Sequence, residues 1–385
     1  MSNKRKTFIT GILLTLIGLC GISFIALLVI NQSIPESSQN PHVLSENQIL
    51  LAGEAHHLIS ELGDEVFPGW SAEPTAWVFY NEVAAFAVGI EAPHSRGWVM
   101  YPRTHRRGGE WQPISNLGPT IFRAMIDDPQ KTPENFVVKV DNQIAASFQT
   151  QEYALIYLYQ LMYTDLPPIL REVFPYRLFF QDLILAPEAY ISSLAHEAFH
   201  VFQANRNPEM FEKAELVAGL DKQYPFDDDN LSSDWIKELK ILQQAGSISN
   251  REEAAEVARQ FLDSRSQRRQ SAQLSILLLD YERKREWLEG TAKYAELEIG
   301  KIAAQNKFLP LPDSNLKLGL KTYNSREKFW KTQITTMSKT NMDGETLFYY
   351  SGFAQGILLD YLMPAWKVRV LEGEYLEDLL AESIR

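Results

Sequence analysis

Two histidines and a glutamate lie close together in the segment His196-Glu197-Ala198-Phe199-His200. In a helix, side chains four residues apart share a face with Cβ atoms about 6 Å apart, so both imidazoles can bind one metal ion at about 2.0–2.1 Å. Glu197 lies one residue further round such a helix, where a carboxylate can take a proton from a metal-bound water. The spacing therefore predicts a metal site with a general base beside it.

The other histidines and the single cysteine restrict the choice of a third ligand. Five of the seven histidines lie in the first 110 residues, and none follows His200. Cys20, the only cysteine, lies within an N-terminal apolar run. We therefore expect a carboxylate as the third ligand and Zn²⁺ as the metal, with the fourth position open for water.

Candidate carboxylates occur in the segment Glu286-Trp-Leu-Glu289-Gly290-Thr-Ala-Lys-Tyr294-Ala-Glu296. With the first motif, this segment resembles the gluzincin (peptidase MA-like) zinc metallopeptidases, in which H-E-x-x-H is followed by a helix carrying W-x-x-E-G-x-A-x-Y. The resemblance implies that Glu289 is the third zinc ligand and that Glu296 supports a ligand histidine from behind. Two turns apart, both carboxylates lie on one helical face, which agrees with these roles. The alternative is a charged helix whose acids are merely solvated.

A third segment, Tyr349-Tyr-Ser-Gly-Phe-Ala354, begins an apolar helix. It resembles the Y-x-x-G-F-A segment of the aminopeptidase-like gluzincins, whose first tyrosine stabilises the oxyanion. The resemblance assigns this role to Tyr349, with Tyr350 as the alternative donor. A protonated phenol can donate a hydrogen bond to the negative oxygen of a tetrahedral state. Both rings can instead be core aromatics at the start of a helix.

The motifs together predict a zinc-dependent hydrolase, and the resemblance implies a metallopeptidase in which Glu197 takes the proton of a zinc-activated water. The G-x-M-E-N signature of exopeptidases is absent, so an endopeptidase is favoured over an aminopeptidase. A non-catalytic zincin-like ectodomain that binds a partner, and a zinc hydrolase of a non-peptide substrate, remain alternatives. The expected partner is a peptide or protein substrate, and a net charge of −12 argues against nucleic acid.

The N-terminus predicts a membrane anchor. Lys4, Arg5 and Lys6 precede the uncharged residues 8–30, which as a helix would span about 34 Å, more than a hydrocarbon core of about 30 Å. No clear A-x-A cleavage pattern follows them. We therefore expect a single-pass protein of the cell membrane, with residues 1–7 in the cytoplasm, residues 8–30 in the lipid bilayer and the catalytic domain extracytoplasmic.

Strand-like segments precede helical ones along the rest of the chain. Apolar runs bounded by turn residues predict strands at 76–80, 85–89, 98–101, 136–140 and 176–185, and helical spacing predicts helices at 44–62, 151–165 and from Pro187 onward. This order predicts an α+β fold, with an N-terminal transmembrane helix, a mixed sheet and then a mainly helical zincin-like catalytic domain.

The predicted domain organisation follows from these elements. A polar stalk with two prolines at 31–43 leads into a β-rich part at 44–148. The catalytic core occupies 149–300 and carries a helical insertion at 206–280, for which we hypothesise a role as a roof over the cleft. A helical C-terminal part follows at 301–385.

Overall fold

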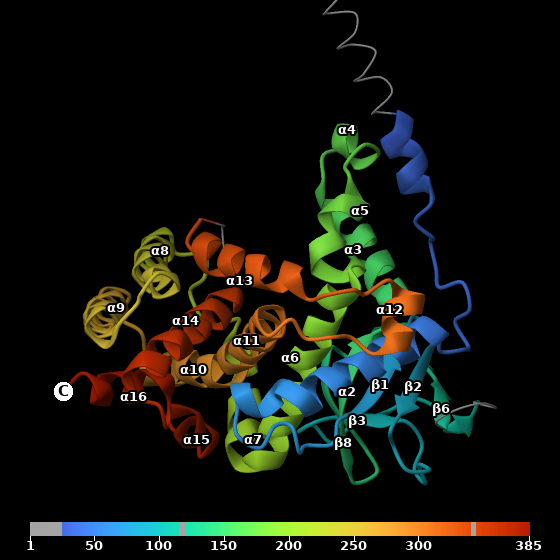
Figure 1. Cartoon of the computed structure of the whole chain (residues 1–385), viewed down its shortest axis with the longest axis horizontal. Coiled ribbons are helices and arrows are strands. Elements are labelled where there is room, and N and C mark those ends of the chain that lie inside the picture. The colour runs from blue at the N-terminus through green and yellow to red at the C-terminus, as the bar shows by residue number, and fades with distance from the viewer. Residues whose placement is uncertain (1–24, 115–119, 340–343) are drawn as a thin grey trace, which may run out of the picture.

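The computed structural model describes residues 25–114, 120–339 and 344–385. A β-sheet lies at one end of the molecule, and helices α8, α9 and α16 lie at the opposite end (Figure 1). The strands are β1 (Ala76–Tyr80), β2 (Ala84–Val88), β3 (Trp98–Met100), β4 (Arg106–Arg107), β5 (Gln112–Pro113), β6 (Ile121–Met125), β7 (Phe136–Val140) and β8 (Gln143–Gln149). The α-helices are α2 (Glu46–Val66), α3 (Gln151–Asp165), α4 (Pro168–Arg171), α5 (Tyr176–Phe179), α6 (Pro187–Arg206), α7 (Pro208–Leu216), α8 (Asp229–Leu242), α9 (Arg251–Ser271), α10 (Ile276–Arg285), α11 (Thr291–Gln305), α12 (Pro312–Leu318), α13 (Asn324–Thr336), α14 (Thr346–Leu362), α15 (Trp366–Leu371) and α16 (Leu376–Ser383). Short 3₁₀ turns are η1 (Pro129–Lys131), η3 (Ala218–Leu220) and η4 (Gln243–Gly246), and π-helical turns are η2 (Gln181–Leu185) and η5 (Glu286–Gly290).

The described strands form one mixed sheet in the order β4-β3-β7-β8-β1-β2-β6-β5. Its central strands β1 and β8 pair in parallel, with Ala76 opposite Ala145, and the neighbouring pairs are antiparallel. Alternate residues of a strand face opposite sides. Trp77 and Phe79 join the large core formed with the helices, whereas Val78 joins a smaller apolar cluster on the other side. The sheet is therefore covered on both faces, and β1 is buried along its whole length.

Helix α6 packs between the sheet and the other helices. It contacts β8 on one side and α2 and α11 on the other. Pro187 occupies its first turn, where no N–H partner is needed, and Glu188 complements the helix dipole there. Ile191, Leu194 and Phe199 are fully buried. Because both sides are packed, the side chains of α6 are held in place along three central turns.

A buried network of charges joins α8, α9, α10 and the π-turn η5. Arg265 donates hydrogen bonds to Glu238 (2.8 Å and 3.0 Å) and to Glu286 (2.8 Å from Nη1). Arg268 donates to Glu238 (2.7 Å) and to Glu282 (2.6 Å). All five side chains are at most 2% exposed. Buried charges are tolerated only when each has a close partner, so this network fixes how the four elements pack.

The membrane-spanning part of the predicted fold class is corrected by the structure. Among the described residues, no helix is both long and apolar enough to cross a bilayer, so the expected anchor at 8–30 and the single-pass localisation derived from it are not supported. Residues 8–24 of that segment lie outside the described residues. Residues 25–32 are helical. At their end the Asn31 side chain donates to the carbonyls of Glu172 and Phe174 at 2.9 Å.

The segment 31–43, predicted as a stalk, makes further contacts with the body of the protein. Ile34 belongs to the large apolar core. The backbone N–H and the hydroxyl of Ser38 both donate to the carboxylate of Glu82, each at 2.7 Å.

The predicted strand at 176–185 is wrong, because these residues form helix α5 and the π-turn η2. A short apolar run does not by itself distinguish a strand from a helix. Here Leu178 is 75% exposed while Tyr176 is fully buried, a pattern set by packing of α5 against the neighbouring turns.

The charge network predicts a dependence of stability on pH. Burial alone would raise the pKa of Glu282, but the charges of Arg268 and Arg269 lower it to about 2. A carboxyl whose pKa is lowered in the folded state stabilises the protein at pH values above its unfolded-state pKa, which is near 4.5. This stabilisation is lost as the pH falls toward 2. We expect the free energy of unfolding of the wild type, measured in urea, to fall between pH 5 and 2 by about 3 kcal/mol more than that of Glu282→Gln.

Glu256→Gln, on the exposed face of the neighbouring helix α9, is the control. Its unfolding should follow the wild-type pH profile closely, because an exposed ion pair contributes little. A wild-type profile for Glu282→Gln as well would contradict the role given to Glu282.

Candidate metal centre

The two histidines of the first motif lie side by side on α6. His196 is 8% exposed and His200 is 1% exposed, and their ring centroids are 4.9 Å apart with the rings nearly perpendicular. The ring of His200 also packs against Phe136 at the start of β7, with centroids 4.8 Å apart. The sheet and α6 thus enclose the two imidazoles from opposite sides.

Glu289 completes the group from the π-turn η5. Its Oε2 lies 3.4 Å from Nε2 of His196 and 3.3 Å from Nε2 of His200. Ligands at about 2.0–2.1 Å from a tetrahedral metal are about 3.4 Å from one another, so both distances have the value that shared coordination requires. The three buried ligand atoms all lie within 4.8 Å of each other. These residues could therefore hold a metal ion.

Each histidine is oriented by a hydrogen bond at its other ring nitrogen. Nδ1 of His196 lies 3.2 Å from Oε2 of Glu296, and Nδ1 of His200 lies 2.8 Å from Oε1 of Gln203. With Nδ1 donating, Nε2 of each ring presents its lone pair toward Glu289. Glu296 is held in turn by Lys293, whose ammonium donates to it at 2.8 Å and 3.0 Å.

Gln203, which sequence analysis did not select, links the two ligand-bearing helices. While its carbonyl oxygen accepts from His200, its amide nitrogen donates to the Trp287 carbonyl at 3.1 Å and to the Thr291 hydroxyl at 2.9 Å. The side chain is 1% exposed. Its position three residues after His200 was a signal, because residues at this spacing are neighbours on a helix.

Arg285 pairs with the carboxylate ligand from the opposite side. Its Nη2 donates to Oε1 of Glu289 at 3.0 Å and to Glu345 at 2.8 Å. The guanidinium therefore binds the one oxygen of Glu289 that faces away from the histidines. The spacing of four residues between Arg285 and Glu289 was the only sequence signal for this pair.

Glu197 lies beside the three candidate ligands without a partner for one of its oxygens. Within the described residues, Oε2 of Glu197 is buried and accepts no hydrogen bond, and the same holds for Oε2 of Glu289. Burial raises the pKa of Glu197 to about 8. A buried carboxylate oxygen without a donor is costly, and a metal ion with its bound water would satisfy both oxygens.

The charges of the two histidines are set in opposite directions. Burial disfavours a proton on His196, but the adjacent carboxylates of Glu289 and Glu296 raise its pKa to about 10. Burial lowers the pKa of His200. An imidazole nitrogen must be deprotonated to bind a metal ion, so a cation at this centre would displace any proton on Nε2 of His196.

The two tyrosines of the third segment point to different places. The ring of Tyr349 stacks on that of His196, with centroids 5.8 Å apart and an interplanar angle of 5°. Burial and the nearby charge of Glu289 raise the pKa of Tyr349 well above its ordinary value, so the phenol stays protonated. Tyr350 instead donates its hydroxyl hydrogen to Gln333.

A contact between two glycines brings α14 against the π-turn. A Cβ on Gly352 would lie 2.6 Å from Cα of Gly290 and 2.9 Å from the Glu286 carbonyl oxygen. Gly290 follows Glu289 directly, and Gly352 is three residues after Tyr349. The absence of side chains at this crossing thus lets Tyr349 approach the candidate ligands.

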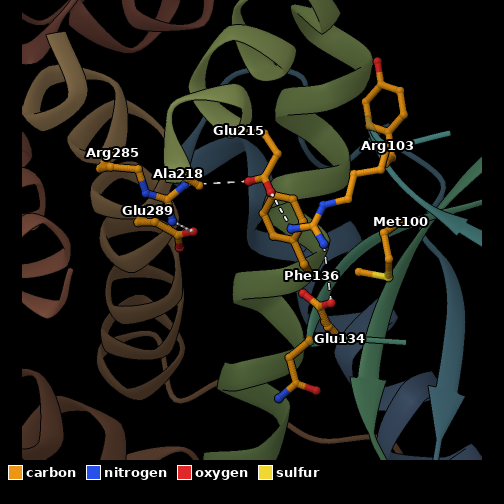
Figure 2. Close-up of a pocket in the computed structure, with 10 residues that line it drawn as sticks. Met100, Arg103, Glu134, Phe136, Glu215, Ala218, Arg285 and Glu289 are labelled. Carbon is orange, nitrogen blue, oxygen red and sulfur yellow. Dashed lines mark hydrogen bonds and ion pairs between the residues drawn. The ribbon is translucent and has the colours of Figure 1, made fainter. Parts of the chain in front are cut away.

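A small pocket of about 160 Å³ opens beside Glu289. Arg285 and Glu289 line one wall, and Arg103 and Glu134 line the other, with Glu215 of α7 between them (Figure 2). Of the three candidate ligands, Glu289 is the one that lines this pocket.

Comparison of the chain with protein-family models, curated proteins and solved structures gives no match.

The site predicts one bound metal ion per chain. With three protein ligands and none to spare, His196→Ala or Glu289→Ala should each lower metal content at least tenfold, measured by elemental mass spectrometry after dialysis. His94→Ala, far from the centre on an exposed loop, should keep the wild-type content. Full metal content in Glu289→Ala would exclude Glu289 as a ligand.

The glycine crossing predicts a second, separate effect. Gly352→Ala should lower the free energy of unfolding by about 1–3 kcal/mol, because the added methyl group forces two backbones apart. The control is Gly53→Ala in α2, where a Cβ meets no atom within 4 Å, and this change should stabilise the helix by about 0.5–1 kcal/mol. Equal unfolding midpoints in urea for the two variants would contradict the close crossing.

Proposed function

We propose that the protein is a zinc-dependent peptide hydrolase with a gluzincin-like site. The observation that carries this proposal is the buried, unpartnered carboxylate oxygen of Glu197 next to the converging side chains of His196, His200 and Glu289. Glu197 contributes nothing to binding a metal through these three ligands. Burying this carboxylate beside the candidate ligands costs free energy, and a buried carboxylate with a raised pKa in this position suits the role of a general base in hydrolysis.

Two imidazoles and one carboxylate at tetrahedral spacing favour zinc over the harder cations, which prefer oxygen ligands. Three protein ligands leave a fourth position for water, as in catalytic rather than structural zinc sites. When bound, zinc lowers the pKa of its water and polarises the substrate carbonyl.

The residues of the chain supply the remaining steps. Glu197 accepts the proton of the attacking water and passes it to the leaving amine, for which a pKa near the working pH is best. Tyr349, held protonated at the site, donates a hydrogen bond to the carbonyl oxygen as negative charge develops on it. Glu296 and Gln203 keep the imidazoles in the tautomer that presents Nε2.

The decisive variant is Glu197→Gln, which keeps the size of the side chain but cannot accept a proton. Zinc content should stay at the wild-type level, while the rate of peptide cleavage falls by about two to four orders of magnitude. Cleavage is measured by mass spectrometry on a broad peptide library with zinc-loaded protein.

Glu188→Gln serves as the control, because Glu188 lies on the same helix and its carboxylate accepts a hydrogen bond from Ser325 away from the centre. It should cleave as the wild type does. If the wild type and Glu197→Gln carry equal amounts of zinc and have the same activity on every peptide, Glu197 is not a general base and the proposal fails.

A further inference from the structure

The pocket beside Glu289 contains an arginine with unused donors. Arg285 is 5% exposed, and its Nη2 already binds Glu289 and Glu345. In the described part of the chain, its Nε and Nη1 are buried and have no hydrogen-bond partner. Since Arg285 lines the pocket, these unpartnered N–H groups belong to its wall.

A second arginine faces the first across the pocket and is only loosely paired. Arg103 lies 3.6 Å from Glu134 and 3.6 Å from Glu215, and Arg285 lies 3.7 Å from Glu215. These separations exceed the 2.7–3.2 Å of normal N–H···O hydrogen bonds. The side chain of Arg103 is 52% exposed and can therefore move toward a ligand. Figure 2 shows the two guanidinium groups on either side of Glu215.

The arrangement favours an anionic over a cationic ligand. Among the described residues that line the pocket, the buried unpartnered atoms are Nε and Nη1 of Arg285 and Oε2 of Glu289, and this last oxygen faces the two histidines. Burial also raises the pKa of Glu215 to about 7, which reduces its negative charge near neutral pH. Both arginines stay charged at any working pH.

We propose that this pocket binds a carboxylate of the substrate next to the scissile bond, with Arg285 as the fixed partner and Arg103 as the movable one. A guanidinium fork matches the two oxygens of a carboxylate. The pocket volume of about 160 Å³ is below the range of about 300–1,000 Å³ of pockets for larger ligands, so it accepts a single residue. The inference rests on the proposed function, because it names the substrates of the same centre.

The carboxylate can come from an acidic side chain or from the C-terminus of the peptide, and two substrate pairs distinguish these sources. One pair carries internal Glu or Gln beside the cleaved bond, and the other ends in a free carboxylate or an amide. In one of the two pairs, we expect kcat/KM of the zinc-loaded wild type to be about tenfold or more higher for the carboxylate form than for the uncharged form. This factor corresponds to the free energy of one hydrogen bond to a charged group.

Arg103→Ala should abolish this preference, and Arg103→Lys should restore part of it. The matched control is Arg259→Ala, whose side chain is likewise 52% exposed but lies on α9, away from the pocket. It should keep the full preference. Equal cleavage of both members of both pairs by the wild type, or an unchanged preference in Arg103→Ala, would overturn the inference while leaving the zinc hydrolase in place.

If no peptide is cleaved, that result counts against the proposed hydrolase but not against the pocket. A binding measurement on chelator-treated protein then tests the pocket by itself. Acetyl-trialanine with a free carboxylate and its amide are compared by ligand-observed NMR, together with acetyl-glutamate amide and acetyl-glutamine amide. Binding of one carboxylate form that weakens about tenfold in Arg103→Ala supports the pocket assignment. Indistinguishable signals for acid and amide forms in both pairs would overturn it.

Discussion

The position of one π-helical turn determines where the candidate metal centre forms. Glu289 belongs to η5, and this turn is held at both ends: Arg265 binds Glu286 at its start, and Gly290 packs on Gly352 at its end. Gln203 adds a third restraint by donating to carbonyls within the turn. Because η5 cannot shift along its axis without breaking these contacts, the distances of Glu289 from the two imidazoles are fixed by packing remote from them.

The buried charges of α8, α9 and α10 extend these restraints over a large part of the helical half. Removing an arginine and a carboxylate from water costs several kcal/mol each unless close hydrogen bonds replace the lost hydration. Arg265 and Arg268 have such bonds, and Arg268 also stacks on Trp235, with the guanidinium carbon 3.7 Å from the ring centroid. The segment 206–280 thus contributes at two places: α7 supplies Glu215 to the pocket, and α8 and α9 anchor the turn that carries Glu289.

The sequence contained enough information to select the candidate ligands but not the contacts that hold them in place. Spacing on one helix selects His196 and His200, and these residues do lie together with Glu289 in the structure. Strands at Ala76–Tyr80 and Phe136–Val140 also lie where alternation and turn residues predicted them. Gln203, Arg103 and Arg285 were missed because spacing along one helix shows at most one of their partners. Gln203 also donates to Trp287, Arg285 also donates to Glu345, and Arg103 pairs with Glu134 and Glu215. The membrane helix was inferred from the length and apolar character of residues 8–30, the three basic residues before them and the missing cleavage pattern. The described residues contain no helix that could cross a bilayer.

The π-turn also has a consequence for how the chain tolerates insertions and deletions. A π-turn contains one residue more per turn than the α-helix around it, and the helices α10 and α11 continue on either side without a break. Deleting a single residue within 286–290 would convert the π-turn into an ordinary α-helical turn and leave α10 and α11 nearly in register. Glu296 would stay beside His196, but Glu289 would lose the position from which its Oε2 faces both imidazoles. The same deletion in the loop between α11 and α12 would leave Glu289 in place. Natural length variation in this protein's relatives should therefore be confined to the loops and excluded from η5.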